Sequence, residues 1–463
     1  MASSSHKSDQ LLALIRENKP MTKGQMLNLI FQLSIPSILA QLTSVLMFFI
    51  DQAMVGRISV EAAAACGLVE SSTWFFGNLT AAASMGFSVQ VAHHIGAGDF
   101  AKARQVSRHA LLVTTLLSGA VGLMGLIIAP HLPLWLGGGA DIATDASIYF
   151  GVFMLVLPFF QLSSLSASML KCAGNMRVPS AMSIIMCVMD VVFNFIFIFV
   201  FHLGVLGVAM GTGLSIVIGS LIQGYIAVYR SPILSLRREG ERFKYNNIFV
   251  RKAGEIGAPM ALQSLLMSGA YIVCTVIVAP LGNIAIAANT FAITAESVCY
   301  MPGFGIGEAA TTLIGQSIGA RRRELCRAFA QRAVALGMVV MAVMGAVMYI
   351  FAPEMMSLMT PSAQIVDLGA SILRIEAWAE PMYAAAIVSY SVFVGAGDTL
   401  RPAGMNLFSM WVVRLTLAAL LAPHYGLRGV WIAMAIELTF RGTIFLARLL
   451  RGRWMRFQPE TSN

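Results

Sequence analysis

Long apolar stretches, each about as long as a bilayer is thick, alternate with short polar stretches along this chain. A membrane-spanning helix needs ~20 apolar residues, and on this basis the sequence predicts twelve spans. Their predicted limits are 27–54, 62–94, 106–130, 144–170, 180–201, 205–229, 249–279, 284–317, 329–352, 364–394, 402–422 and 428–447. The runs are continuous and do not alternate with polar residues as the strands of an outer-membrane barrel do. The pattern therefore predicts an all-α polytopic membrane protein.

Composition supports this interpretation. Of the 463 residues, 57% are hydrophobic and 11% are charged, whereas soluble proteins carry about 25% charged residues. The six cysteines are scattered without a CxxC pair or a His/Cys cluster, so neither a disulfide framework nor a metal site is expected. The N-terminal stretch before Gly24 lacks the apolar core of a signal peptide, and the first apolar segment is expected to be the first membrane anchor.

The positive charges predict how the chain crosses the membrane. The predicted spans are joined by connections that lie alternately on the two sides of the membrane. On one side these connections contain only Arg57 and Arg428, while most of the 31 Lys and Arg lie on the other side. Positive charge marks the cytoplasmic side. Both termini are therefore expected in the cytoplasm, and the protein in the cytoplasmic (inner) membrane.

The chain also contains an internal repeat. Prolines recur at one constant offset, as Pro36 and Pro259, Pro130 and Pro353, Pro158 and Pro381, and Pro179 and Pro402. We expect two parallel six-helix repeats, related by an axis along the membrane normal, with a cleft for alternating access. The predicted parts are a cytoplasmic segment 1–24, an N-lobe 25–230, a basic cytoplasmic linker 231–246, a C-lobe 247–450 and a cytoplasmic tail 451–463.

A carboxylate lies near the middle of the fifth predicted span. Asp190 shares a helix stripe with Ser183, Cys187 and Asn194, and the rest of the span is apolar. A charge at this depth costs ~2.5–3.5 kcal/mol or more. Such residues usually have a function, although pairing to another helix for packing alone is the alternative.

Asp51, at the outer end of the first predicted span, is a second candidate. It shares a helix face with Gln41, and it either joins Asp190 in one cavity or contacts headgroups and Arg57. Two acids in a low-dielectric cavity favour each other's neutral form, which is the chemistry of a proton carrier. With Asn194 and Thr212 as neutral oxygen donors, the same pair could instead hold Na⁺.

Several stretches resemble the multidrug and toxic compound extrusion (MATE) transporters. They are IPSILAQLTSVLMFFIDQAMVGRI, KCAGNMRVPSAMSIIMCVMDVVFNF, MPGFGIGEAATTLIGQSIGA and VGAGDTLRPAG. The resemblance implies a cation-coupled antiporter that exports amphipathic, often cationic, compounds. In the branch with an acid in helix 5, the acids of helices 1 and 5 hold the coupling H⁺ or Na⁺. Asp51 and Asp190 match these positions, and Thr212 matches a supporting threonine.

The sequence departs from the family pattern at three positions. Met186 replaces an asparagine that often precedes the helix-5 acid, which weighs against an oxygen-rich Na⁺ site. Met267 and Tyr383 occupy the positions of the acids of the other branch. At the repeat offset, Asp51 corresponds to Cys274 and Asp190 to Val413. Coupling is therefore expected in the N-terminal half alone.

Other charges lie within predicted spans. Gln41, Glu296 and Glu308 are candidates for a substrate cavity, with the acids attracting cationic compounds. Glu437 and Arg441 are expected to pair on their own helix. A similar local set is predicted for Arg374, Glu376 and Glu380, and Glu70 and Arg414 have no evident partner.

The sequence leaves other functions open. A lipid-linked precursor flippase of the same superfamily is one alternative, and an ion channel with a ring of acids is another. No hydrolase or Walker motif is visible, so no enzyme activity and no cofactor are expected. The expected partners are small amphipathic molecules and the lipid bilayer, with no nucleic acid, and the chain is expected to be a monomer.

Overall fold

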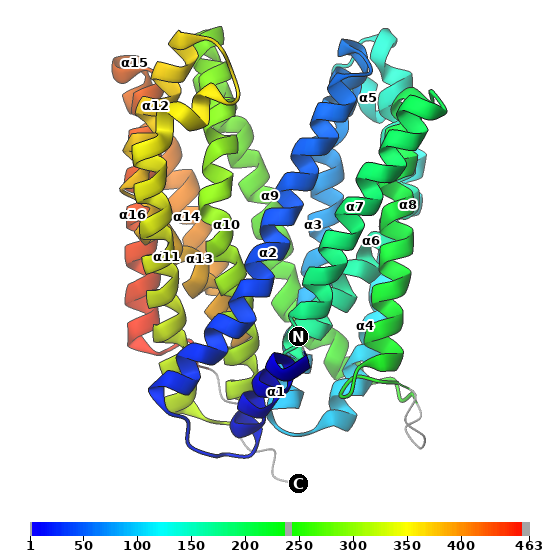
Figure 1. The fold of residues 1–463 in the computed structure, drawn as a ribbon, viewed down its shortest axis with the longest axis vertical. Helices are drawn as coiled ribbons and strands as arrows, with labels where there is room; N and C mark the ends of the chain where they lie inside the picture. Colours follow the sequence, from blue (N-terminus) through cyan, green and yellow to red (C-terminus); the bar gives the residue numbers. More distant parts are fainter. Residues whose placement is uncertain (1, 237–242, 456–463) are drawn as a thin grey trace. The chain divides into compact units, whose positions relative to one another are not determined.

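The computed structural model describes residues 2–236 and 243–455, and every regular element in them is helical. The α-helices are α1 (Ala2–Arg16), α2 (Lys23–Gly56), α3 (Val60–Gly96), α4 (Phe100–Ile128), α5 (Leu132–Trp135), α6 (Ala140–Cys172), α7 (Arg177–Phe195), α8 (Gly204–Tyr225), α9 (Asn247–Val278), α10 (Asn283–Gly319), α11 (Arg323–Ser357), α12 (Ala363–Ala377), α13 (Glu380–Gly395), α14 (Leu400–Phe408), α15 (Leu415–Tyr425) and α16 (Leu427–Arg451). Figure 1 shows most of them as long helices and α1 and α5 as short ones. Short π-helical or 3₁₀ turns are Ile196–Val200, Ile226–Arg230, Ala279–Leu281 and Ser409–Arg414.

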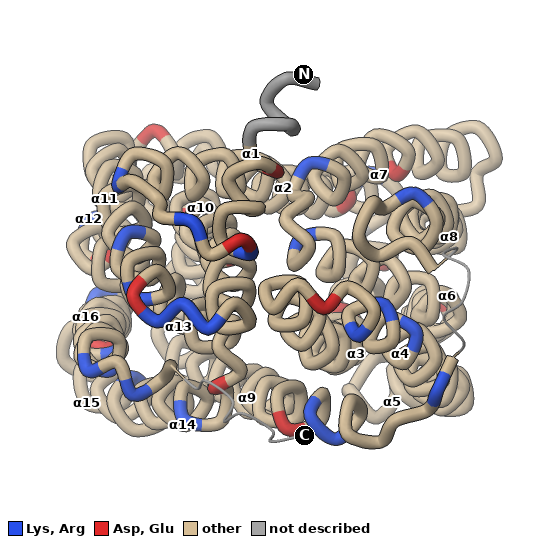
Figure 2. Tube along the Cα trace, turned by 90° about the horizontal axis from the view of Figure 1, so that it is seen from below, with Lys and Arg blue, Asp and Glu red and all other residues tan. Residues whose placement is uncertain are grey.

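Each of the twelve predicted spans coincides with a helix or a helix pair, so the predicted fold class is confirmed. Ten helical segments of the described chain are long and apolar enough to cross a membrane. One of the other two predicted spans corresponds to α3. The other corresponds to α12 and α13, and these two helices form one interrupted helix. In the end-on view of Figure 2 most of the chain is tan, because few charged residues lie along the helices.

The helices form two compact units, which we describe separately. The N-terminal unit comprises residues 43–261, and the C-terminal unit comprises residues 1–42 and 262–463. The boundaries lie within α2 and α9, so each unit takes in the first part of a helix whose remainder belongs to the other. The lobes 25–230 and 247–450 predicted from the repeat have other boundaries than these units, of which the C-terminal one is built from two stretches of sequence. The predicted lobes stay a prediction.

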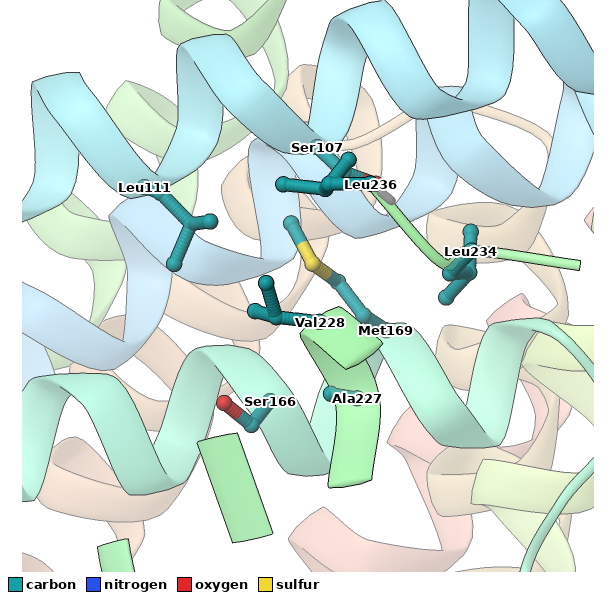
Figure 3. Close-up of a pocket in the computed structure, with 8 residues that line it drawn as sticks. All are labelled: Ser107, Leu111, Ser166, Met169, Ala227, Val228, Leu234 and Leu236. Carbon is teal, nitrogen blue, oxygen red and sulfur yellow. The ribbon is translucent and has the colours of Figure 1, made fainter. Parts of the chain in front are cut away.

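In the N-terminal unit, α6 packs against α3, α4 and α8, and α7 packs against α8. The helices approach closely at Gly122, where an added Cβ would lie 2.8 Å from the carbonyl oxygen of Met154. A cavity of about 10 Å³ lies between α4, α6 and the chain after α8, with Met169 among its lining residues (Figure 3). A cavity of this volume admits at most about one water molecule. It is therefore too small to bind a drug-sized compound.

In the C-terminal unit, α10, α11 and α13 pack against one another, α12 packs against α11, and α16 packs against α13. The interrupted helix turns at Trp378 and Ala379, and Pro381 lies in the first turn of α13. Proline is tolerated there because a first-turn N–H has no partner in its own helix. An added Cβ on Gly345 of α11 would lie 2.8 Å from the carbonyl oxygen of Ala377.

The described part of the polar N-terminus is also helical, which the sequence did not predict. Leu11, Leu12 and Ile15 of α1 are buried, and α1 contacts α10. The Arg322 guanidinium at the start of α11 donates a hydrogen bond of 2.9 Å to the carbonyl oxygen of Leu14. α1 is therefore packed onto the C-terminal unit.

The predicted linker is held against α4 where it is described. Arg104 donates to the carbonyl oxygen of Ile233 at 3.2 Å, and Arg108 donates to that of Leu236 at 3.3 Å. At the far end, the backbone N–H of Asn246 donates to His109 at 2.8 Å. Residues 237–242 of the linker and 456–463 of the predicted tail lie outside the described residues.

Candidate functional site

Three helices of the N-terminal unit bring the predicted ion-coupling residues together. The side-chain amide of Asn194 on α7 donates to Asp51 on α2 at 3.1 Å and to Asp190 on α7 at 3.3 Å. The same amide lies 3.4 Å from the hydroxyl oxygen of Thr212 on α8. The four residues that the sequence selected as ion-coupling or ion-supporting therefore form one contiguous cluster.

The cluster is largely closed to solvent. Asp190 and Asn194 are 0% exposed, and Asp51 and Thr212 are partly buried. Asp190 Oδ1 and Asn194 Oδ1 have no hydrogen-bond partner among the described residues. A buried acceptor without a donor is costly, by about 1–3 kcal/mol or more for a charged group. The cluster therefore offers oxygen atoms to a proton or a small cation.

A glycine on α8 allows this arrangement. A Cβ at Gly211 would lie 2.0 Å from Asn194 Oδ1 and 2.8 Å from the Asn194 backbone nitrogen. Only a residue without a side chain lets α8 approach α7 so closely. The π-helical turn Ile196–Val200 begins two residues after Asn194, and such turns are frequent at functional sites.

Met186 fills space one turn before Asp190 instead of adding an oxygen ligand. An added Cβ on Gly219 of α8 would lie 2.4 Å from Met186 Cγ and 2.6 Å from Met186 Sδ, so the thioether is packed against α8. At this position, where the resembling family often has an asparagine, the structure therefore has a packed thioether and no oxygen ligand.

The three residues predicted for a substrate cavity do not form one group. Gln41 donates to Glu308 at 3.1 Å, within the C-terminal unit. These two residues lie where α2 and α10 are in close contact. Gly305 makes this contact possible, since an added Cβ there would lie 2.6 Å from the backbone nitrogen of Ile38. Glu296 lies earlier on α10 and is grouped with Glu376 and Glu380 instead. A role of the three in substrate binding stays a prediction.

The predicted local set of Arg374, Glu376 and Glu380, which spans the end of α12 and the start of α13, is wrong. Arg374 turns away from the glutamates, donates to the carbonyl oxygen of Tyr349 at 3.0 Å and lies over the Tyr349 ring at 5.6 Å. Glu376 and Glu380 face the opposite way, toward Glu296 on α10. The sequence could not show this, because the helix break between the two glutamates alters the stripe on which they would otherwise lie.

The predicted pair on α16 is confirmed. Arg441 lies 2.7 Å from Glu437, and both side chains are buried. Arg414, which had no evident partner in sequence, lies 4.0 Å from the same glutamate. Glu70 accepts a long hydrogen bond of 3.5 Å from Gln52.

Known proteins share this fold and sequence pattern. A sequence profile of the MatE family matches residues 36–196 and again residues 259–420. The chain belongs to the MatE family. The two matches begin at Pro36 and Pro259, a pair of the repeated prolines, so each half of the chain carries one copy of the family pattern. Members of this family are transporters and not enzymes, as the sequence predicted.

Curated relatives match over nearly their whole length. A "Probable multidrug resistance protein NorM" of Thermotoga maritima is 25% identical over 437 residues, which are 92% of each chain. A protein of the same name from Bradyrhizobium diazoefficiens is 25% identical and covers 90% of this chain and 91% of its own. An "Uncharacterized transporter YisQ" of Bacillus subtilis is 24% identical over 414 residues, 88% of this chain and 90% of its own.

Solved structures share the fold. A MATE transporter crystallised in complex with MaL6 superposes with a TM-score of 0.89 at 23% identity and covers 96% of this chain and 98% of its own. A transporter of the MOP superfamily from Pyrococcus furiosus, described as having a binding pocket of reverse polarity, gives 0.87 at 23% identity and covers 96% of this chain and 97% of its own. At this identity the likeness concerns the fold alone.

Proposed function

We propose that this protein is a cation-coupled antiporter that exports amphipathic, often cationic, compounds by alternating access. The family assignment and the relatives named as multidrug resistance proteins support the export of such compounds. The expected setting is the cytoplasmic membrane with both termini in the cytoplasm, as the positive-inside pattern of the sequence favours.

One observation carries the proposal of coupling. The amide of Asn194 links Asp51 of α2 to Asp190 of α7, and one oxygen of Asp190 is left without a partner among the described residues. Two acids joined in this way on different helices respond together to a bound cation. Neutralising them removes a like-charge repulsion and lets α2 and α7 come closer, so ion binding can change helix positions.

The proton is the proposed coupling ion. A proton needs only the two carboxylates, whereas Na⁺, a hard cation, needs several oxygen ligands. Besides the two acids, the cluster offers Asn194 Oδ1 and the Thr212 hydroxyl, and at the position where the family often has an asparagine the Met186 thioether packs against α8. The few neutral oxygens favour H⁺ over Na⁺.

The test uses purified protein in vesicles loaded with a fluorescent cationic drug. Gradients of H⁺ and of Na⁺ are imposed separately on wild-type protein and on Asp190→Asn, which keeps the shape of the side chain and removes its charge. We expect export under the H⁺ gradient in the wild type and none in the variant. Export driven by Na⁺ at equal pH on both sides would contradict the choice of ion, and wild-type rates in the variant would contradict the site.

A further inference from the structure

A second group of acids lies in the C-terminal unit, apart from the residues of the proposed coupling site. Glu296 comes from α10, Glu376 from the last turn of α12 and Glu380 from the start of α13. One carboxylate oxygen of each lies within 4.8 Å of those of the other two. Glu376 and Glu380 are 0% exposed, and Glu296 is 4% exposed.

The carboxylates of Glu376 and Glu380 receive no hydrogen bond from an N–H or hydroxyl donor in the described part of the chain. Glu376 lies against the carboxyl group of Glu296, and these two can share a hydrogen bond only when one of them is protonated. Arg374 is turned toward Tyr349, and Arg414 is directed at Glu437 and the Met434 sulfur. Buried carboxylates that lack both hydrogen bonds and an ion pair are strongly unfavourable. They must therefore be neutralised by a bound cation or by protons of their own.

The surroundings neutralise these acids only in part. Ala295, Cys299, Leu373 and Ala377 flank the acids in sequence and belong to one buried apolar core. Arg414 attracts Glu296 and Glu376 electrostatically, but it forms its ion pair with Glu437. The break after Ala377 adds the backbone groups of two helix ends. The C-terminal end of a helix such as α12 carries partial negative charge from its last carbonyls, which adds to the negative potential and favours a cation.

The backbone is shaped to place the acids there. The break between α12 and α13 puts Glu376 and Glu380 on two helix ends that meet beside α10. Gly345 of α11 leaves room for this junction, since an added Cβ would lie 2.8 Å from the carbonyl oxygen of Ala377 and 3.1 Å from Glu380 Cβ. Interrupted membrane helices that present oxygens at their broken ends are a common way to bind ions in transporters.

We propose that Glu296, Glu376 and Glu380 together bind one divalent metal cation of the size of Ca²⁺. Three oxygens at most 4.8 Å apart share a centre about 2.8 Å or less from each, close to the ~2.3–2.6 Å of a Ca–O contact. Mg²⁺ requires shorter contacts and near-octahedral geometry. Three carboxylates also leave a residual charge of −2 around a monovalent ion and −1 around a divalent one. A divalent ion therefore neutralises the buried site more completely.

This site is distinct from the ion positions considered in the sequence. At the repeat offset that relates Pro36 to Pro259, its residues correspond to Thr73, Phe153 and Leu157 of the N-terminal half, which cannot form such a cluster. It also shares no residue with the positions of the acids in the other branch. The bound ion would tie α10 to the broken helix, independently of whether Asp190 couples transport.

The experiment measures binding of Ca²⁺ to the full-length protein in detergent at pH 8. Equilibrium dialysis with radioactive Ca²⁺ gives the number of ions per chain, and the thermal unfolding midpoint is followed with Ca²⁺ and with chelator. We expect one ion per wild-type chain and a Ca²⁺-dependent rise of the midpoint. Both effects should be lost in Glu376→Gln and in Glu380→Gln. Glu354→Gln, at an exposed position of α11, is the matched control and should bind as the wild type does.

Three results would overturn the proposal. The first is no binding to the wild type at millimolar free Ca²⁺, which would mean that the acids are neutralised by their own protons. The second is undiminished binding in both glutamine variants that remain folded. The third is binding of Na⁺ and not of Ca²⁺, measured by the same dialysis, which would contradict the divalent assignment. If one glutamine variant fails to fold, Ca²⁺ binding by the other variant and the number of ions bound per wild-type chain still test the proposal.

Discussion

The two halves of this chain share a scaffold but differ in where they carry buried acids. In the N-terminal unit, Asp51 and Asp190 are bridged by a neutral donor, the amide of Asn194. In the C-terminal unit, Glu376 and Glu380 lie in the core and receive no hydrogen bond from an N–H or hydroxyl donor of the described residues. In the proposed function, the first arrangement keeps two acids available for a proton. The second concentrates negative charge, as a site for a metal cation does.

The two halves share their closest helix contacts but differ in one helix break. Gly122 and Gly345 correspond to each other in the repeat, and each would place an added Cβ 2.8 Å from a carbonyl oxygen, of Met154 and Ala377 respectively. These two carbonyls are related by the same offset. The helix that contains Pro158 is nevertheless continuous, whereas its counterpart is broken just before Pro381. The close helix contact recurs in both halves, whereas the buried acids and the helix break do not.

Neutralising acids in the two halves should produce the largest contrast. Asp190→Asn is expected to reduce gradient-driven export to the level of vesicles without protein, because the proposed coupling ion loses its ligand. Glu296→Gln and Glu308→Gln should leave the coupling to the gradient in place and change drug affinity or nothing. Export rates in vesicles with an imposed H⁺ gradient provide the measurement. If Glu296→Gln abolishes coupling as fully as Asp190→Asn, the two halves do not differ in this function.

Sequence patterns predicted the twelve spans, and a polar stripe together with the family resemblance selected Asp51, Asp190, Asn194 and Thr212. A polar stripe within an apolar span and a fixed repeat offset can be read from residue spacing. The cluster around Glu376 could not be predicted. It joins residues far apart in the sequence, and it depends on a helix break that no spacing rule identifies. The helix α1 was missed because its apolar run, residues 11–15, is only five residues long and follows a polar stretch.

The second contrast concerns acids with and without a cationic partner inside the C-terminal unit. Arg441→Met removes the guanidinium 2.7 Å from buried Glu437, and breaking such a pair costs about 3–5 kcal/mol. Arg414, at 4.0 Å, compensates for this only in part. The free energy of unfolding in detergent should therefore fall by this amount, while Glu376→Gln, which breaks no ion pair, should leave it unchanged or raise it in the absence of divalent ions.

Arg401→Met, at an exposed position of α14, is the control for this measurement. A loss of stability in Arg441→Met no larger than in the control would show that Glu437 does not depend on its ion pair.

The third contrast tests the close helix approach in the N-terminal unit. Gly211→Ala places a methyl group 2.0 Å from Asn194 Oδ1 and 2.8 Å from its backbone nitrogen, and overpacking of this kind costs about 1–3 kcal/mol. Gly119→Ala on α4 meets no atom within 4 Å and should stabilise the helix by roughly 0.5–1 kcal/mol. Thermal unfolding of both variants gives the comparison, and equal stability of the two would mean that α7 and α8 are not tightly fitted at the site.

The smallest expected effect belongs to Thr212 and distinguishes the two candidate ions. Its hydroxyl lies 3.4 Å from the Asn194 amide, a long contact that contributes little, so Thr212→Val should cost at most about 1 kcal/mol of stability. A proton shared by the two aspartates does not need this oxygen, and H⁺-driven export should stay within about threefold of the wild type, a change of less than about 1 kcal/mol. For Na⁺ the hydroxyl would be one of few neutral ligands, and its removal should abolish transport, with Thr212→Ser restoring it. Loss of export in Thr212→Val together with rescue by Thr212→Ser would therefore overturn the proton as the coupling ion, while leaving the location of the site intact.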